Sequence, residues 1–352
     1  MAITSSRLIP YHLPLHKSWS SAQGTFKSRD GWLIRICDEE GVCGVGDCAP
    51  LPQAGTEAPD IACQWLKQTL TVWANQEPQV ALAALNANQD SPPAAHCGIE
   101  TALTDLIAQR AGIPLAHWLN PDAVDTILVN ANLGTLDNST VDRLEEADGF
   151  SVIKLKVGLA SVETELALLK RVAERLPPGI SLRLDANQAW GREEAEHFIN
   201  GCSDLPIESI EEPLSAPTLD TLKQLQRFSP FPLAIDESLN SLEYEKIFQI
   251  RPVERLSLKP MVLGGLSASL DLAKRAYESG MACVVTTTVD SAVGVWAATH
   301  LAAALGIQGQ QVTHGLATSS WLTEDIADGP VIRQGKITLG DKAGLALHLP
   351  NT

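Results

Sequence analysis

The chain has 352 residues, which is long enough for one large and one smaller domain, and 45% of its residues are hydrophobic, which is sufficient for a substantial core. Its formal net charge of −16 excludes nucleic acid and anionic membrane surfaces as partners, because proteins bind both through positive patches. No apolar stretch approaches the roughly 18 residues of a membrane span, and residues 1–15 lack the apolar core of a signal peptide. We therefore expect a cytoplasmic protein, with its seven scattered cysteines as free thiols in a reducing compartment.

The first 120 residues predict an α+β domain in which short strands precede helices. Glycine and acidic residues at 38–41 are typical of a hairpin turn. The polar segment 18–24 is predicted to be a loop, either a solvated connector or a flap over a site. The expected strands lie at 8–15, 33–37 and 42–45, and the expected helices at 58–73 and 94–111.

Residues 121–321 alternate between apolar strand-like runs and amphipathic helical segments such as 162–176. About eight such units predict a closed (β/α) barrel of the α/β class. An open doubly wound sheet is the alternative, but residues 129–134 do not form the glycine-rich phosphate turn typical of that fold. The strands are expected to end near Asn132, Lys156, Asp185, Glu211, Asp236, Lys259, Thr287 and Gly315.

The alternation stops after Trp321, and residues 322–352 form a C-terminal tail. Two short strands are predicted between Val331 and Leu349, around Gly340-Asp341-Lys342. We expect this tail to return and pack on the N-terminal domain.

Charged residues stand where successive barrel strands are predicted to end, which is the edge at which such barrels carry their catalytic groups. Three carboxylates on neighbouring strands repel one another unless a cation lies among them. Oxygen ligands with open positions favour Mg²⁺, with Mn²⁺ as a substitute ion. The predicted metal ligands are Asp185, Glu211 and Asp236, and we expect Asn187 and Glu237 to support them from behind.

Lysines flank this predicted metal site from two sides of the barrel. Lys154 and Lys156 are two residues apart, so they project from one face of a strand, and Lys259 ends a strand across the ring. A lysine beside a second lysine and a metal has a lowered pKa and can serve as a general base near neutral pH. The metal can hold a substrate carboxylate, so we expect an anionic small molecule as substrate.

Each of these motifs has an ordinary reading when it is taken alone. A Lys-x-Lys pair is usually a solvated strand face, and Asp-Ala-Asn at 185–187 could cap a helix. Five consecutive strand ends with Lys, Asp, Glu, Asp and Lys favour a site instead. By parity Arg183 points into the barrel as an ion-pair partner, and structural roles are favoured for His314 and His96.

This order of residues resembles the enolase superfamily, in its muconate-lactonising subgroup. That resemblance implies a (β/α)7β barrel covered by a capping domain built from both chain ends. The mandelate-racemase subgroup would have a histidine at the end of strand seven, where this chain has Thr286-Thr287-Thr288.

Within the subgroup, several segments resemble the o-succinylbenzoate synthase family. They are Lys-Ser-Arg-Asp-Gly at 27–31, Ala-Pro-Leu-Pro at 49–52, and the strand ends at 154–158, 182–190, 210–213, 235–239 and 258–260. The resemblance implies a syn dehydration of 2-succinyl-6-hydroxy-2,4-cyclohexadiene-1-carboxylate to o-succinylbenzoate, a step toward menaquinone or phylloquinone.

The same resemblance implies a role for each lysine. Lys156 would remove the α-proton and then protonate the departing hydroxide, Lys259 would stabilise the enediolate from the opposite face, and Lys154 would tune and orient Lys156. Substrate contacts are expected from Ser21, Thr286, Thr287, Thr288 and Gly315.

Three alternatives remain open. A dipeptide epimerase usually has an Asp-x-Asp at the end of strand eight, and residues 314–321 contain no acidic pair. An N-succinylamino acid racemase would use similar site residues with both lysines as acid and base. A non-catalytic barrel that keeps the metal for structure would function without Lys156 and Lys259. The sequence predicts no oligomeric state.

Overall fold

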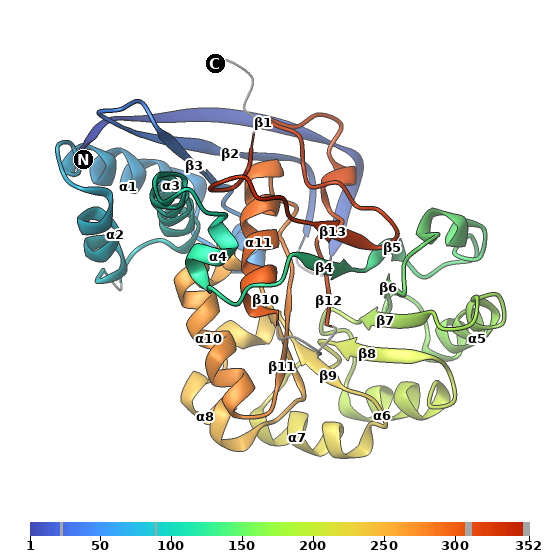
Figure 1. Ribbon diagram of the computed structural model, residues 1–352. Coiled ribbons are helices and arrows are strands. Elements are labelled where there is room, and N and C mark those ends of the chain that lie inside the picture. The colour runs from blue at the N-terminus through green and yellow to red at the C-terminus, as the bar shows by residue number, and fades with distance from the viewer. Residues whose placement is uncertain (22–23, 89, 307–311, 348–352) are drawn as a thin grey trace.

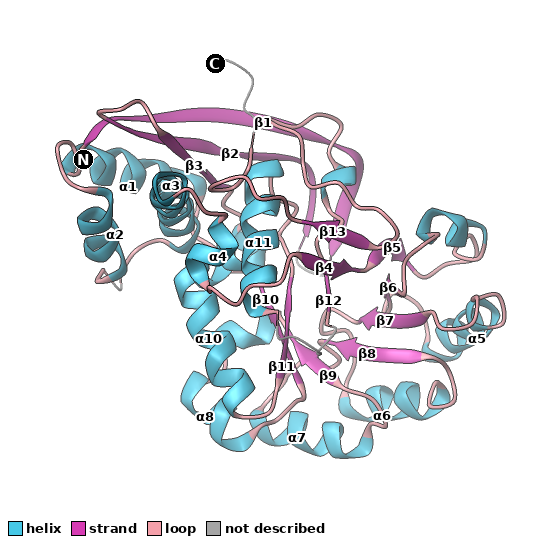
Figure 2. Ribbon diagram, in the orientation of Figure 1, coloured by secondary structure: helices cyan, strands magenta, loops and turns pink. Residues whose placement is uncertain are grey.

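The computed structural model describes residues 1–21, 24–88, 90–306 and 312–347, with the side chains of 18–21 and 24–25 outside the description. An antiparallel sheet with its helices lies across one end of a parallel sheet that curls into a barrel (Figure 1). The helices of the barrel form its outer layer (Figure 2). In the described part of the chain, no helix has both the length and the apolar composition needed to cross a bilayer.

The N-terminal region is built on three antiparallel strands, β1 (Ile3–Ser21), β2 (Gly24–Asp38) and β3 (Cys43–Cys48). The predicted loop at 18–24 is wrong for residues 18–21, because the ladder between β1 and β2 continues to the pair Ser21 and Gly24. Cys37 and Cys43 are joined by a disulfide, so the expectation of seven free thiols is wrong for these two.

Three helices pack beside this sheet, and their bounds are α1 (Pro59–Val72), α2 (Pro78–Asn86) and α3 (Pro93–Ala111). Helix α3 is buried along almost its whole length, because it lies between the sheet and the barrel. Helices α1 and α3 match the predicted ranges within one residue, whereas α2 was not predicted. A short helix, α4 (Leu115–Leu119), leads into the barrel.

The parallel sheet has seven strands that neighbour one another in chain order. They are β5 (Ala131–Thr135), β6 (Val152–Lys156), β7 (Ser181–Asp185), β8 (Ile207–Glu211), β9 (Leu233–Ile235), β10 (Arg255–Leu258) and β11 (Ala282–Val285). The outer helices are α5 (Val162–Ala173), α6 (Arg192–Gly201), α7 (Leu219–Phe228), α8 (Tyr244–Ile250), α9 (Pro260–Leu263), α10 (Leu266–Glu278) and α11 (Ala292–Leu305). Apolar residues of both sets form one continuous core.

An eighth strand position closes the barrel. Strand β12 (Thr313–His314) pairs in parallel with β4 (Thr126–Val129), and a single bridge joins Thr286, after β11, to Gly315. Since β4 continues into β5 after Asn130, the ring of hydrogen-bonded strands is complete. The predicted fold class, a (β/α)7β barrel with a separate N-terminal α+β domain, is confirmed.

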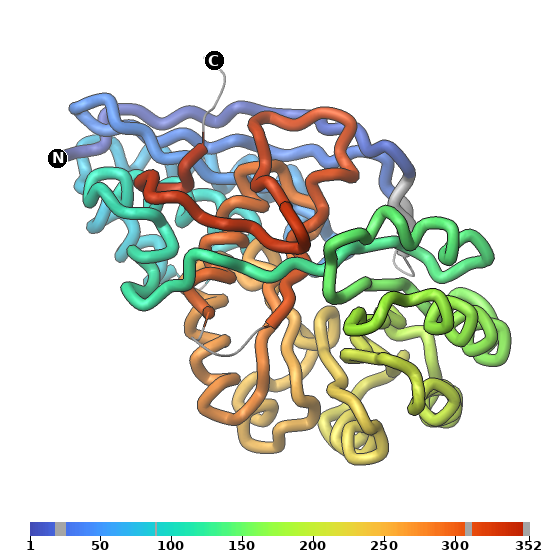
Figure 3. Tube along the Cα trace, turned by 45° about the vertical axis from the view of Figure 1, so that its right-hand side comes forward, coloured from blue at the N-terminus to red at the C-terminus, as the bar shows by residue number. Residues whose placement is uncertain are grey.

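The C-terminal tail runs between the N-terminal strands and the barrel (Figure 3). The described part of the tail contains one strand, β13 (Lys336–Thr338), rather than the two predicted, and it pairs antiparallel with β4 of the barrel. Contact with the N-terminal region is made elsewhere in the tail, where Leu322 bridges Leu15 and Gly344 bridges Pro114.

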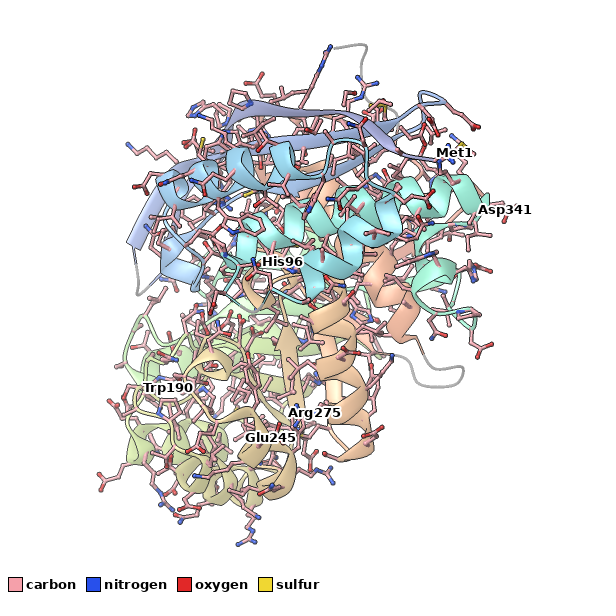
Figure 4. All side chains as sticks on the ribbon, turned by 90° about the vertical axis from the view of Figure 1, so that its left-hand side faces the viewer. Met1, His96, Trp190, Glu245, Arg275 and Asp341 are labelled. Carbon is pink, nitrogen blue, oxygen red and sulfur yellow. A yellow bond between two sulfur atoms is a disulfide. The ribbon has the colours of Figure 1, made fainter. Side chains whose placement is uncertain are left out.

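Buried carboxylates fix the N-terminal region to the barrel. Glu100 of α3 accepts hydrogen bonds from the backbone N–H groups of Leu266 (2.5 Å) and Ser267 (3.0 Å), at the first turn of α10. Asp47 of β3 accepts from Ser291 just before α11. Helix α3, marked by His96 in Figure 4, lies at this junction. Such carboxylates satisfy the unpaired N–H groups of a helix start, so the two parts are held in one arrangement.

Candidate active site

A pocket opens at the carboxyl ends of the barrel strands and is covered by the N-terminal region. Its lining residues are Phe26, Leu51, Gln53, Ala54, Asn130, Asn132, Lys154, Lys156, Asp185, Asn187, Asp236, Glu237, Lys259, Thr286, Thr287, Thr288, Val289, Gly315, Ala317, Thr318 and Trp321. The pocket therefore brings together the three predicted lysines and most of the predicted carboxylates. Glu211, predicted beside them, lies behind Lys154 and does not line the pocket.

Lys154 lies between two of the carboxylates. Its ammonium lies 2.8 Å from Oδ2 of Asp185 and donates to Oε2 of Glu211 at 2.7 Å. Parallel pairing places Asp185 of β7 directly beside Glu211 of β8, so one lysine on β6 reaches both. Burial opposes the charge of Lys154, but the two carboxylates outweigh burial and raise its pKa. Burial would raise the pKa of Glu211, but the charges of Lys154 and Lys259 outweigh it and hold that pKa at about 2.

Lys156 lies two residues beyond Lys154, on the same face of β6. It pairs with Asp185 in the parallel ladder between β6 and β7. Its side chain is largely buried, at 7% exposure for the residue. Burial lowers the pKa of Lys156, and the charges of Lys154 and Lys259 add to this effect while Asp185 opposes it. The predicted like-charge effect of Lys154 is present, but burial is the larger cause.

Lys259 stands on the opposite side of the site, directly after β10, and donates a hydrogen bond to Oδ2 of Asp236. Burial opposes its charge, yet the carboxylates of Asp236 and Glu237 raise its pKa. Burial also raises the pKa of Asp236. The charge of Lys259 lowers this pKa, whereas the charges of Glu237 and Glu211 raise it further. The cluster thus holds more carboxylates than the neighbouring lysine charges neutralise, which favours an additional cation.

Asn187 contacts both groups that it was predicted to support. Its backbone N–H donates to Oδ1 of Asp185 (3.1 Å), and its side-chain amide donates to Oε1 of Glu237 (2.9 Å). Asn187 has a φ of 42°, a left-handed conformation that asparagine tolerates better than most residues. The turn after β7 therefore directs an amide toward Glu237.

The donor set fits a hard divalent cation by its chemistry. Oε1 of Glu211 and Oε2 of Glu237 are buried without a hydrogen-bond partner among the described residues, which is costly unless another group pairs with them. In the described residues, however, no three acidic, histidine or cysteine side chains already stand close enough to share an ion. The lysine contacts explain this, because ammonium groups occupy the space between the carboxylates.

Glu212 was not predicted, yet it fixes the end of strand β9. One carboxylate oxygen accepts from the backbone N–H of Asp236 (2.6 Å) and from the N–H (2.8 Å) and hydroxyl (2.5 Å) of Ser238. Burial raises the pKa of Glu212 to about 7, against these hydrogen bonds. The second glutamate of the Glu-Glu-Pro sequence thus sets the backbone that carries Asp236.

The predicted substrate contacts are only partly described. Thr286, Thr287, Thr288 and Gly315 all line the pocket, and the Thr286 hydroxyl donates to the Gly315 carbonyl at 3.1 Å. The hydroxyls of Thr287 and Thr318 lie 2.7 Å apart. Ser21 lies at the end of β1, and its side chain is outside the described residues.

Apart from Gly315, sequence reasoning missed the lining residues that the N-terminal region and the loop after β12 contribute. Phe26 and Gln53 come from the first part of the chain, and Thr318 and Trp321 from the last barrel loop. No local pattern distinguishes these side chains. The Ala-Pro-Leu-Pro segment at 49–52 was noted as a motif, and its location beside the pocket gives it a structural context.

Arg183 and His314, which were predicted to be structural, lie outside the pocket lining. Arg183 pairs with Glu208 at 3.0 Å and donates to Asn130 and to the Thr313 carbonyl inside the barrel. Nδ1 of His314 accepts from the backbone N–H of Val285 at 3.0 Å, and burial lowers the pKa of His314 to about 3. Neither residue lines the pocket.

Two family models match this chain. The model described as "Enolase C-terminal domain-like" matches residues 139–351, and the model described as "MenC, N-terminal domain" matches residues 3–106. The first covers the barrel from β6 onward and the tail, and the second covers the antiparallel sheet, α1, α2 and most of α3.

Individual proteins of three activities are similar over most of the chain. The o-succinylbenzoate synthase of Thermosynechococcus vestitus is 30% identical over 83% of this chain and 86% of that protein. The N-succinyl-L-Arg/Lys racemase of Bacillus cereus is 25% identical over 99% of this chain and 96% of that protein. The solved dipeptide epimerase of Enterococcus faecalis, complexed with Mg and L-Leu-L-Tyr, has a TM-score of 0.87 at 25% identity and covers 99% of both chains. Overall similarity therefore leaves synthase, racemase and epimerase activities open.

Proposed function

The chain belongs to the enolase superfamily, whose members are enzymes, and we propose that it is an o-succinylbenzoate synthase. The reaction is the syn dehydration of 2-succinyl-6-hydroxy-2,4-cyclohexadiene-1-carboxylate to o-succinylbenzoate. The match to the MenC N-terminal domain supports this assignment over the part of the chain that covers the pocket.

The observation that carries the proposal is where the acidic side chains of the pocket stand. Of its described carboxylates, Asp185 is the last residue of β7, and Asp236 and Glu237 directly follow β9. The described wall from the loops after β11 and β12 contains threonine, alanine, valine and tryptophan side chains but no carboxylate. A dipeptide carries an ammonium group, which would lack an anionic partner on that wall. The pocket is better suited to a substrate whose far end carries no positive charge.

Lys156 is proposed as the general base and acid. Its burial beside other lysines lowers its pKa, so it can take the α-proton from the substrate. As an ammonium it can then give that proton to the hydroxide that leaves from the same face. The step breaks one C–H and one C–O bond, forms the last double bond of the ring, and releases water. One lysine is sufficient because both bonds break on one side.

Lys259 is proposed to act as a fixed positive charge. Its hydrogen bond with Asp236 and its raised pKa keep it an ammonium, so it stabilises negative charge that develops on the substrate from the opposite face. The environments of Lys156 and Lys259 thus push their pKa values in opposite directions, which matches different roles.

We propose Asp185, Glu211 and Asp236 as the residues that would hold Mg²⁺. When bound, the ion would supply positive charge to a substrate carboxylate and to the enediolate that proton removal creates. Lys154 compensates Asp185 and Glu211 in this structure and would have to move as the ion entered. Asn187 and Glu237 would orient the ligand set through their mutual hydrogen bond.

An assay of substrate preference tests the proposal. The purified protein with Mg²⁺ is given the cyclohexadiene, a panel of dipeptides and a panel of N-succinylamino acids, and kcat/KM is determined for each. We expect the cyclohexadiene to be preferred by at least about 100-fold, which corresponds to about 2.7 kcal/mol of transition-state stabilisation. Turnover of N-succinylamino acids alone would identify a racemase, and turnover of dipeptides alone would identify an epimerase; either result would end the synthase assignment.

A further inference from the structure

Arg29 is a buried arginine between two segments that line the pocket. It belongs to β2, and its residue exposure is 2%. Among the described residues it forms no ion pair with a carboxylate; its guanidinium donates instead to three backbone carbonyls. A buried arginine bonded in this way fixes the backbone that it contacts, because it presents its donors in a rigid planar fork.

The three carbonyls belong to two segments that contain or adjoin lining residues of the pocket. Arg29 donates to Ala49 at 2.6 Å and to Pro50 at 3.2 Å, directly before the lining residue Leu51. It also donates to Val289 at 3.1 Å, directly after the three lining threonines. One side chain of the N-terminal region therefore ties a segment of its own region to a segment of the barrel.

Val289 has a backbone conformation that valine rarely adopts. Its φ is 62°, and a β-branched residue in this left-handed region is strained unless its surroundings hold it there. Its side chain is 4% exposed and packs in an apolar cluster with Leu13 and Leu322. The carboxylate of Asp290 accepts from the N–H and hydroxyl of Thr288, which bends the chain at the same point.

Arg29 itself does not line the pocket, so it is not placed to touch a substrate. Its contact on the pocket side is Phe26, whose ring centroid lies 5.8 Å from the guanidinium carbon and which does line the pocket. The guanidinium thus contacts three parts of the wall without lining the pocket itself. They are Phe26, the segment 49–54 and the segment 286–290.

We propose that Arg29 is a positioning residue that holds the segments 49–54 and 286–290 against each other, keeps Val289 in its strained conformation, and so sets the shape of the pocket wall that selects the substrate. The proposal deepens the proposed function and rests on it for its kinetic readout alone. The lining residues of these two segments include no carboxylate and none of the proposed metal ligands.

Hydrogen–deuterium exchange without substrate tests the clamp directly. In Arg29→Met we expect backbone amides of 51–55 and 286–291 to exchange at least tenfold faster, while amides of 185–190 and the Mg²⁺ affinity stay within twofold of wild type. Arg29→Lys keeps the charge but loses the fork, and we expect the same pattern at smaller amplitude. Val289→Gly in the Arg29→Met background should recover exchange protection at 286–291 by at least threefold, because glycine adopts this φ without strain.

The kinetic readout uses whichever substrate the wild-type protein turns over. We expect Arg29→Met to raise KM at least tenfold with a smaller change in kcat. The ratio of kcat/KM between the preferred substrate and the others should become smaller. Uniformly faster exchange over the whole chain, or unchanged exchange at 286–291, would overturn the proposal, as would an equal loss of Mg²⁺ affinity. If the wild-type protein fails to dehydrate the cyclohexadiene, the proposed function fails, while the exchange result still decides the role of Arg29.

Discussion

Lys154 donates a hydrogen bond of 2.7 Å to Oε2 of Glu211, whose other carboxylate oxygen is buried without a hydrogen-bond partner among the described residues. The same ammonium lies 2.8 Å from Asp185. A lysine paired in this way stays charged, so it is less suited than Lys156 to accept a proton from a substrate. The two lysines of the Lys-x-Lys sequence therefore differ in role: Lys154 compensates the charge of the carboxylates, and Lys156 is the one suited to proton transfer.

Removal of Lys154 tests this compensation. Lys154→Met leaves two buried carboxylates without their cation, so we expect the free energy of unfolding in EDTA to fall by about 3 kcal/mol. Saturating Mg²⁺ should restore much of the loss, because the ion replaces the missing charge. Urea unfolding with and without Mg²⁺ measures both effects. Lys274→Met, which breaks an exposed pair with Asp271, is the control and should cost less than about 1 kcal/mol.

Removal of one proposed metal ligand should weaken Mg²⁺ binding. Glu211→Gln keeps the size of the side chain but removes its charge, and we expect Mg²⁺ affinity by calorimetry to fall at least about tenfold. The control is Glu208→Gln, three residues earlier on the same strand, where the carboxylate pairs with Arg183 inside the barrel. An equal loss of affinity in both variants would contradict the assignment of Glu211.

Stability should fall on acidification partly through His300 of α11. Burial lowers the pKa of His300 to about 4, and its Nδ1 accepts from the backbone N–H of Ala116. The unfolded chain binds a proton at this histidine near pH 6.5, before the folded chain does, so stability decreases as the pH falls from about 6.5 toward 4. Between pH 7.5 and 5.5 this contributes a loss of about 1.3 kcal/mol.

The substitution His300→Gln should remove this share of the pH dependence, whatever it costs at neutral pH. Urea unfolding at pH 7.5 and 5.5 should show a smaller difference for the variant than for wild type. Thr299→Val, a buried neighbour without a titrating group, should show the wild-type difference. Identical pH dependence in His300→Gln and wild type would show that His300 does not contribute.

The contact between β3 and α3 should not tolerate an added methyl group. A Cβ on Gly46 would collide with the carbonyl oxygen of Gly98, and backbone on both sides leaves no room to adjust. We expect Gly46→Ala to lower the free energy of unfolding by about 1–3 kcal/mol in urea melts. Gly340 provides the control, because a Cβ added there would meet no atom within 4 Å other than those of its chain neighbours. Gly340→Ala should stay within about 0.5 kcal/mol of wild type.

The barrel could be predicted from the sequence because its period is local. Apolar runs and polar strand ends repeat along the chain, and the strands end at Lys156, Asp185 and Glu211 as expected. The same repeat brought Lys154, Lys156 and Lys259 to one pocket. These residues meet in one pocket because the carboxyl ends of parallel strands lie at the same edge of a barrel.

Features that depend on distant contacts could not be predicted. Strand β1 extends to Ser21 because β2 pairs with it, although its own residues there are polar. The strained Val289 and its contact with Arg29, 260 residues earlier, leave no trace in the local pattern. The ion pairs of Lys154 likewise require knowledge of which strand lies beside which.

The central claim is that Lys156 transfers the proton in the dehydration, and the rate of the Lys156→Ala variant tests it most directly. With Mg²⁺ and the cyclohexadiene, we predict a fall in kcat of at least about 10³-fold, while the melting temperature and Mg²⁺ affinity remain those of wild type. Lys170→Ala, at an exposed position on α5, should keep full activity. Dehydration by Lys156→Ala at the wild-type rate would contradict the proposed mechanism.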